Sequence, residues 1–75
     1  MRDLSTIAYE IKRTWKNVYF GAVPYLDAMM SLSSIEDNYM FESAREQVIR
    51  FLSNASTWRG EDARRIKTEL KAMLK

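Results

Sequence analysis

The sequence predicts an all-α fold, a compact bundle of three longer helices and one short helix in a single domain over residues 1–75. Apolar residues recur at the spacing of a helix face in several segments. No stretch of comparable length alternates with the two-residue period of a β-strand. The chain has two glycines and one proline, so few positions interrupt a helix. Short connections between the helices favour antiparallel neighbours.

The first helix is expected over residues 4–17, with Asp3 or Ser5 as its N-cap. Its apolar residues fall at offsets of 0, 3, 4, 7, 11 and 14, which is the spacing of one helix face. Asn17 and Gly21 are the predicted stop signals. The apolar face comprises Leu4, Ile7, Ala8, Ile11, Trp15 and Val18.

Residues 22–32 are predicted to form the short second helix, because Pro24 suits the first turn of a helix. Its apolar residues nearly encircle it, so the helix either lies centrally in the fold or is partly covered by another chain. A patch left exposed at the edge of the bundle would suit a two-fold homodimer, in which the patch covers its own copy. These apolar residues are Tyr25, Leu26, Met29, Met30 and Leu32.

The third and fourth helices are also indicated by helical stripes of apolar residues. The third is expected near residues 39–53, and its stripe comprises Phe41, Ala44, Val48, Phe51, Leu52 and Ala55. The fourth is expected to run to about residue 74, with Ser56 or Thr57 as its N-cap. Its stripe comprises Ala63, Ile66, Leu70, Met73 and Leu74, and Leu70 at its middle is expected to be buried.

The composition argues against an enzyme, a cofactor and a metal site. The chain has no Cys and no His, so it can form no disulfide, zinc finger or iron–sulfur site and no Ser–His or Cys–His nucleophile pair. Its only glycines are Gly21 and Gly60, which excludes a glycine-rich phosphate loop. The carboxylate pairs Glu36–Asp37 and Glu61–Asp62 are adjacent in sequence, and adjacent residues on a helix do not face each other.

The sequence also shows no targeting segment and no membrane span. The N-terminal residues lack an apolar core of the kind found in signal peptides. The longest uncharged and mostly apolar run covers residues 18–26, whereas a membrane-spanning helix needs about 20 residues. A soluble, intracellular protein without membrane contact is therefore expected.

Charge is divided between the ends and the middle of the chain, whose net charge is +2. Residues 1–19 carry four basic and two acidic groups, and residues 59–75 carry six basic and three acidic groups. Residues 20–58 carry two basic and five acidic groups. The basic fourth helix could contact the phosphates of a nucleic acid, or it could be an ordinary solvated surface. The candidate contacts are Arg64, Arg65, Lys67 and Lys71.

A helix-turn-helix motif does not account for this basic helix. Placing Gly21 or Gly60 at the turn puts charged residues where the motif needs apolar ones.

Aromatic residues mark a second candidate surface, where a protein partner could dock. Trp15 and Phe20 are expected in the core, because a small core needs large side chains. The positions of Tyr19 and Tyr25 stay open between core and surface. Trp58, next to Arg59, is either an interface hot spot or a local lid that folds onto the first or third helix. The candidate protein interface therefore comprises Tyr19, Tyr25, Trp58 and Arg59.

Two stretches of the chain carry a resemblance to known sequences. The first is Thr14–Met29, and the second is Phe51–Lys67, which contains the string Ser-Thr-Trp-Arg-Gly-Glu-Asp-Ala-Arg-Arg. Together with the tail Glu69–Leu74 they resemble a group of small hypothetical proteins of tailed bacteriophages and prophages. The resemblance implies a phage or prophage origin and the cytoplasm of a bacterial host. It carries over no activity and no functional residue.

Two functions are compatible with these patterns. The leading hypothesis is a protein–protein interaction module that binds a host or phage protein, with a homodimer as one form of it. The alternative is a weak, nonspecific nucleic-acid-binding accessory protein. Salt separates the two, because binding through phosphates weakens steeply with salt and an aromatic interface weakens much less.

Overall fold

The computed structural model describes residues 2–40 and 42–75, and this part of the chain is compact and mostly helical. The longer helices are α1 (Leu4–Thr14), α3 (Ala44–Ser53) and α4 (Glu61–Met73), and the short one is α2 (Val23–Met29). A single 3₁₀ turn, η1 (Phe20–Ala22), precedes α2. The all-α prediction needs one correction, because β1 (Asn38–Tyr39) and β2 (Glu42–Ser43) form a small antiparallel sheet.

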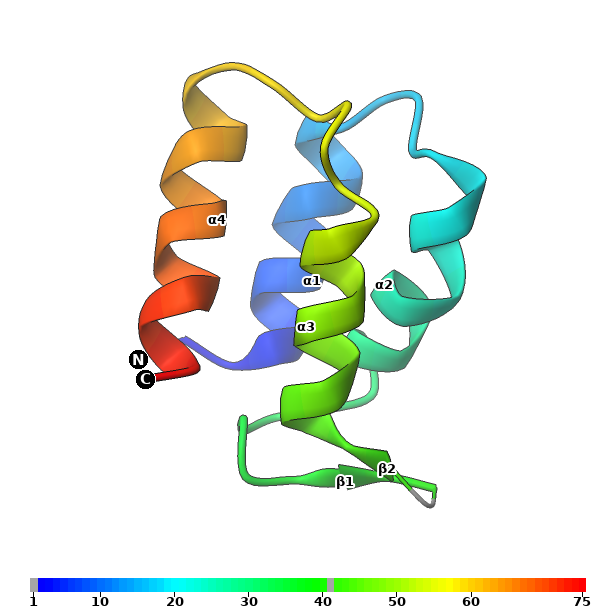
Figure 1. Cartoon of the computed structure of the whole chain (residues 1–75), viewed down its shortest axis with the longest axis vertical. Coiled ribbons are helices and arrows are strands. Elements are labelled where there is room, and N and C mark those ends of the chain that lie inside the picture. Colours follow the sequence, from blue (N-terminus) through cyan, green and yellow to red (C-terminus); the bar gives the residue numbers. More distant parts are fainter. Residues whose placement is uncertain (1, 41) are drawn as a thin grey trace.

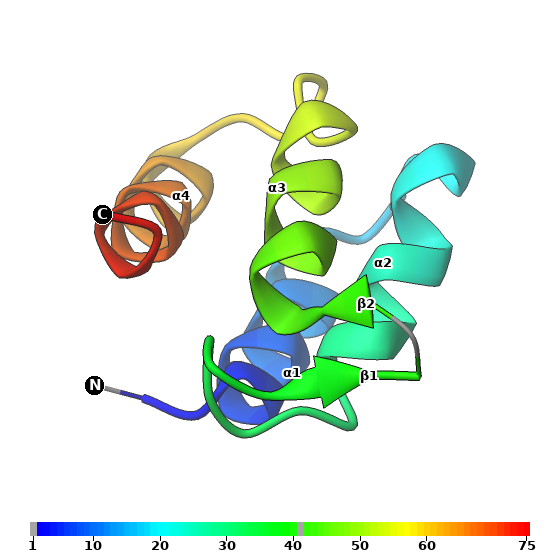
Figure 2. The ribbon, with the colours of Figure 1, turned by 60° about the horizontal axis from the view of Figure 1, so that its bottom comes forward.

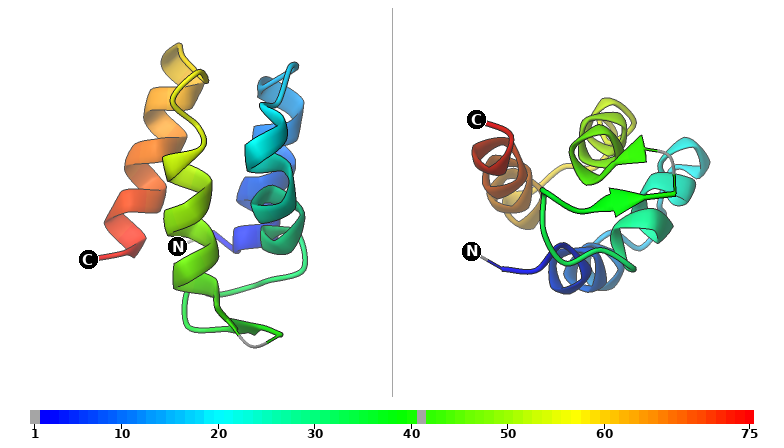
Figure 3. Two further views of the ribbon diagram at one scale, coloured as in Figure 1. Left: turned by 45° about the vertical axis from the view of Figure 1, so that its right-hand side comes forward. Right: turned by 90° about the horizontal axis from the view of Figure 1, so that it is seen from below.

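The four helices stand at the corners of a bundle in which successive helices run in opposite directions (Figure 1). In the tilted view of Figure 2, and in the view from below at the right of Figure 3, α1 lies across from α3 and α2 lies across from α4. The β1–β2 sheet lies at one end (Figure 3). Two connections, residues 15–19 and 54–60, lie at the opposite end, which we call the loop end.

Every helix contributes to one core. Leu4, Ile7 and Ile11 of α1 are fully buried, as are Phe51 of α3 and Ile66 of α4. These residues belong to the apolar stripes expected from the sequence, and burying such stripes is the main source of helix stability in a domain this small. The predicted burial of Leu70 is confirmed.

The five apolar residues that the sequence placed around the second helix are buried or half-buried within one chain. Leu26, Met29 and Leu32 are buried, while Tyr25 and Met30 are half-buried against the core. They are covered because α2 packs on both α1 and α3. These apolar residues were the reason to expect a homodimer, and they pack within the bundle without a second chain. The homodimer stays a prediction.

Helix α1 ends at Thr14, three residues earlier than expected. The Thr14 hydroxyl donates to the Glu10 carbonyl at 2.8 Å, and Trp15 adopts an extended conformation that turns its ring toward the core. At the other end, the Asp3 side chain makes no capping bond. The carbonyls of Ser33 and Leu32 accept hydrogen bonds from Leu4 and Ser5 instead, both at 2.9 Å, so the segment after α2 caps this helix.

Helix α3 begins at Ala44 rather than near residue 39. Residues 38–43 contain the two strands, and Met40 has a φ of 56°, which a continuous helix cannot include. The Ser43 hydroxyl then caps α3 by accepting from the Glu46 backbone N–H at 3.1 Å. The predicted stripe position Phe41 lies outside the described residues.

The expected bounds of the second and fourth helices were also wrong. The second starts as the η1 turn at Phe20, and α2 ends at Met29 rather than residue 32. Helix α4 is preceded by Gly60 as its N-cap instead of Ser56 or Thr57. Gly60 has φ 113° and ψ −177°, a conformation that is essentially reserved for glycine.

Candidate functional site

Three aromatic rings join the helices at the loop end. The rings of Trp15 and Trp58 stack with centroids 5.4 Å apart and an angle of 9° between their planes. Phe51 of α3 meets both edge-on, at 6.2 Å from Trp15 and 6.4 Å from Trp58. Only 6% of Trp15 and 4% of Trp58 is exposed. The expected burial of Trp15 is confirmed, and so is the interpretation of Trp58 as a lid over the first and third helices.

Lys67 connects α4 to this aromatic cluster. Its Nζ donates to the Trp58 carbonyl at 2.7 Å and lies 5.9 Å from the centroid of the Trp58 ring. Burial lowers the pKa of Lys67, and the neighbouring charges of Lys71 and Arg59 lower it further. One interpretation of the sequence placed Lys67 on a solvated surface. The residue is half-buried instead, because its side chain lies against the connection before α4 and bonds the Trp58 carbonyl.

Two open depressions adjoin at the loop end and share Trp58 and Arg59 among their lining residues. One, of about 470 Å³, is lined by residues 14–17 and 57–59. The other, of about 290 Å³, is lined by residues 58–60 together with Ala63, Arg64 and Lys67. We call the pair the basic furrow.

The basic furrow is lined by four cations and no carboxylate. The cations are Lys16, Arg59, Arg64 and Lys67. Within residues 2–40 and 42–75, none of them forms an ion pair within 4.0 Å. Thr14, Asn17 and Thr57 add neutral hydrogen-bonding groups to the lining. Uncompensated cations beside hydroxyl and amide donors form a surface suited to an anion.

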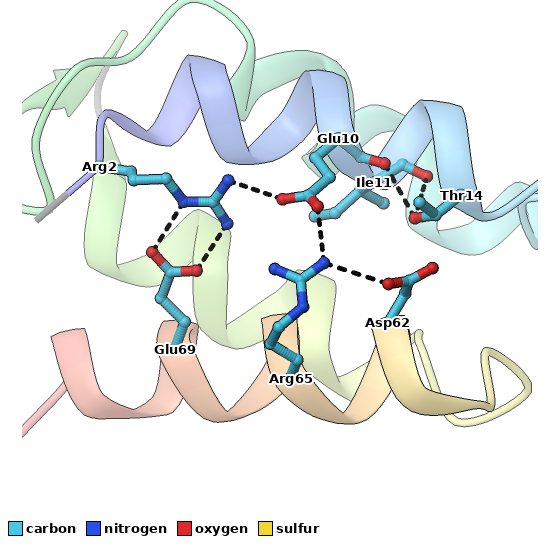
Figure 4. Close-up of polar contacts among 7 residues, drawn as sticks. All are labelled: Arg2, Glu10, Ile11, Thr14, Asp62, Arg65 and Glu69. Atoms are coloured by element: carbon cyan, nitrogen blue, oxygen red, sulfur yellow. Dashed lines mark hydrogen bonds and ion pairs between the residues drawn. The ribbon is translucent and has the colours of Figure 1, made fainter.

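The opposite flank of α4 has its charges compensated, as Figure 4 shows. Glu10 of α1 bridges two guanidinium groups, those of Arg2 and Arg65, each at 2.6 Å. Arg2 also holds Glu69 through two bonds of 2.6 and 3.0 Å, and Arg65 contacts Asp62 at 3.2 Å. Hydrogen bonds from Arg65 and Arg2 lower the pKa of Glu10 to about 2. This network ties α4 to α1.

The structure separates the four basic candidates of α4 into two groups. With 3.6 residues per turn, Arg64, Lys67 and Lys71 share one flank of the helix, and Arg65 points about 200° away from Lys67. Arg64 and Lys67 line the basic furrow, and the exposed Lys71 follows one turn after Lys67. Arg65 belongs to the ion-pair network with α1, so it has no place in the furrow.

The aromatic candidate residues also differ in how far they are buried. Phe20 was expected in the core, and this expectation was wrong because 79% of the residue is exposed. The neighbouring Ala22 fills the core position instead. Tyr19 is 42% exposed, and its ring centroid lies 4.8 Å from that of Phe20. Tyr25 is half-buried, whereas Arg59 is exposed at the furrow.

The exposed pair Tyr19–Phe20, which we call the aromatic edge, stands on a closely packed turn. A Cβ on Gly21 would lie 2.6 Å from Tyr19 Cε2 and 2.9 Å from Asn54 Oδ1, so the backbone approaches both side chains closely. The Asn54 amide is in turn held by the Arg50 carbonyl at 2.8 Å. The turn itself is closed by the Ala22 N–H, which donates to the Tyr19 carbonyl at 2.8 Å.

Sequence reasoning missed Lys16 as a site residue, although a signal was present. The chain contains two dipeptides in which a cation follows a tryptophan, Trp15-Lys16 and Trp58-Arg59. When both tryptophans turn inward and stack, the cation after each one is left at the surface, and both cations line the furrow.

Comparisons of the chain with protein-family models, with curated proteins and with solved structures find no match. The described residues contain no group of three or more Asp or Glu side chains that could hold a metal ion. Nor does this part of the chain include a helix with the length and apolar character needed to cross a membrane.

Proposed function

We propose that this chain is a small accessory protein that binds nucleic acid by holding phosphates in the basic furrow. The observation that carries the proposal is the lining of the furrow, which combines four cations with no carboxylate. Arginine and lysine are the residues that most often contact nucleic-acid phosphates, and hydroxyl and amide side chains supplement them. The exposed Lys71 extends the same flank of α4.

The charge distribution favours weak binding without sequence preference. A net charge of only +2 creates little long-range attraction for a polyanion. The attraction comes from a local concentration of cations, while Glu10 and Glu69 at the other flank are paired with Arg2 and Arg65. Four phosphate contacts correspond to a slope of about −3 for the logarithm of affinity against the logarithm of salt concentration.

A titration by fluorescence anisotropy tests this function. The probe is a labelled oligo(dT) of about 15 nucleotides, titrated between about 50 mM and about 200 mM salt. The double variant Arg59→Gln with Arg64→Gln should weaken binding several-fold and reduce the steepness of the salt slope by about 1.5. Absence of binding at the lowest salt concentration, both to this single strand and to a duplex of the same length, would reject the function.

A matched control removes two charges from outside the furrow. Lys12 pairs with Asp27 at 3.2 Å and Arg50 pairs with Glu42 at 2.8 Å, both at exposed positions. Changing both cations to Gln lowers the net charge by the same amount, so this variant should retain the parental affinity and salt slope. An equal loss in both double variants would mean that overall charge, rather than the furrow, attracts the probe.

The protein–protein interaction module is the second candidate function. The observation that favours it is the exposure of Phe20, which lies one helical turn before the exposed Val23. Exposed apolar groups of this kind can anchor a protein interface. The second copy of a homodimer is the simplest occupant to test, and a phage or host protein is the other. Sedimentation equilibrium should then give twice the mass of 8.8 kDa, and Phe20→Ser should return it to one chain.

A further inference from the structure

We infer that the nucleic acid bound in the basic furrow is single-stranded, with unpaired bases stacked on the aromatic edge formed by Tyr19 and Phe20. This inference rests on the proposed function and adds the form of the ligand. It is carried by two exposed rings that follow the furrow residue Lys16 in the chain, and by the four cations that line the furrow.

One side of the furrow and the aromatic edge belong to the same segment, the connection that follows α1. Lys16 lines the furrow, and Phe20 follows it four residues later. Four residues span at most about 14 Å, so the two groups lie within a short distance of each other. Both are at the loop end, where residues 15–19 run from the top of α1 to the start of α2 (Figure 1). A strand with its phosphates at Lys16 can thus bring the adjoining bases to Phe20.

The aromatic rings at this end fall into a buried group and an exposed pair. Trp15 and Trp58 are buried and stack on each other, so their faces are unavailable to a base. Tyr19 and Phe20 are exposed, with their ring centroids 4.8 Å apart. Stacking on aromatic side chains is the main way in which proteins hold single strands without reading their sequence, because every base has a flat face.

The same geometry disfavours a duplex. In double-stranded DNA both faces of each internal base are covered by the neighbouring pairs, so an exposed ring gains no stacking partner. The furrow also lacks a projecting helix of the kind that enters a major groove. Its cations come from the two connections and the first turns of α4, and Lys67 is held against the loop by the Trp58 carbonyl.

The test compares single-stranded oligo(dT) with a duplex of the same length, and wild-type protein with three variants. Phe20→Leu keeps an apolar side chain but removes the ring. Phe20→Trp restores a ring. Tyr9→Leu is the matched control, because Tyr9 is 60% exposed on α1 and outside the furrow. Both positions of substitution are at the surface, and circular dichroism checks that helix content is unchanged.

We expect the single strand to bind about 10-fold tighter than the duplex. Phe20→Leu should lose about 5-fold or more in affinity for the single strand, with an unchanged salt slope and unchanged duplex binding. Phe20→Trp should restore the affinity, and Tyr9→Leu should match the wild type. Equal affinity for the duplex, or a Phe20→Leu variant that binds like Tyr9→Leu, would overturn the inference while leaving the proposed function intact. If neither the single strand nor the duplex binds, the proposed function itself is rejected.

Discussion

Trp15 and Trp58 stack with ring centroids 5.4 Å apart, although one lies directly after the first helix and the other in the connection before the last. Since Phe51 meets both rings edge-on, this contact brings α1, α3 and the start of α4 together. It also fixes the two connections whose outward-facing cations, Lys16 and Arg59, line the basic furrow. The core at this end therefore determines the shape of the proposed binding surface.

Removing one ring of this pair should destabilise the protein strongly. Trp58→Ala is expected to cost about 3–5 kcal/mol, the range for truncating a large buried aromatic residue. Phe20→Ala is the contrasting variant, because its ring is exposed, and it should change stability by less than about 0.5 kcal/mol. Urea unfolding followed by circular dichroism measures both. Similar midpoints for the two variants would show that Trp58 does not close the core.

Docking of α4 can be tested at Leu70, which is fully buried. Leu70→Ala should lower the free energy of unfolding by about 2–5 kcal/mol. That is a large share of the total stability of a small domain. Thr68→Ala, at an exposed position of the same helix, is the control and should have a small effect. A urea midpoint for Leu70→Ala equal to that of the wild type would mean that α4 does not pack on the core.

Glu10 should make the protein sensitive to acid. Its pKa is lowered from 4.5 to about 2 in the folded state, so between these values the unfolded chain binds more protons than the folded protein. The stabilisation by Glu10 is therefore complete above about pH 5 and is lost as the pH falls toward 2. The urea midpoint should drop between pH 5 and pH 3, and Glu10→Gln should flatten part of this drop.

The control for the acid experiment is Glu61→Gln. Glu61 is exposed at the start of α4 and forms no ion pair with the other described residues. This variant should keep the drop seen in the wild type. A Glu10→Gln variant with the same pH dependence as the wild type would contradict the role assigned to the network with Arg2 and Arg65.

Substitution of Gly60 should destabilise the protein, whereas substitution of Ser56 or Thr57 should not. With φ 113° and ψ −177° at Gly60, an alanine side chain would be strained even though nothing lies within 4 Å of its Cβ. Gly60→Ala is thus expected to cost about 1–3 kcal/mol. Ser56→Ala and Thr57→Ala should have little effect, because neither residue caps α4. If Thr57→Ala lowers the thermal-unfolding midpoint and Gly60→Ala does not, Thr57 is the N-cap of α4, as the sequence allowed.

The sequence predicted the helical architecture because burial of an apolar face dominates the stability of each long helix. Ile7, Phe51 and Leu70, one from the apolar stripe of each long helix, are buried as expected. Helix ends were harder to predict, since they depend on single contacts such as the Ser43 cap and the turn at Trp15. The strands at residues 38–43 are two residues long, which is too short for a period to be visible.

The candidate site was predicted less well than the fold. Residue type alone did not decide which aromatic residues would be buried, so Phe20 was misplaced and Trp58 kept two interpretations. Among the cations, only the helical stripe of α4 was recognisable from sequence. Lys16 lines the same furrow as Arg59 and Arg64 because Trp15 and Trp58, from distant segments, stack on each other. The spacing of apolar residues in the sequence does not predict such a contact.

The bonds from Arg2 to Glu69 link positions 67 residues apart. The segment just before α1 therefore pairs with a residue that is synthesised much later. Until α4 is present, the flank of α1 that carries Glu10 has no arginine of α4 to pair with, and core residues such as Ile66 and Leu70 are missing. A growing polypeptide on the ribosome can pair α1, α2 and α3 as they emerge, but it cannot close the bundle. The bundle therefore closes only after α4 has emerged from the exit tunnel.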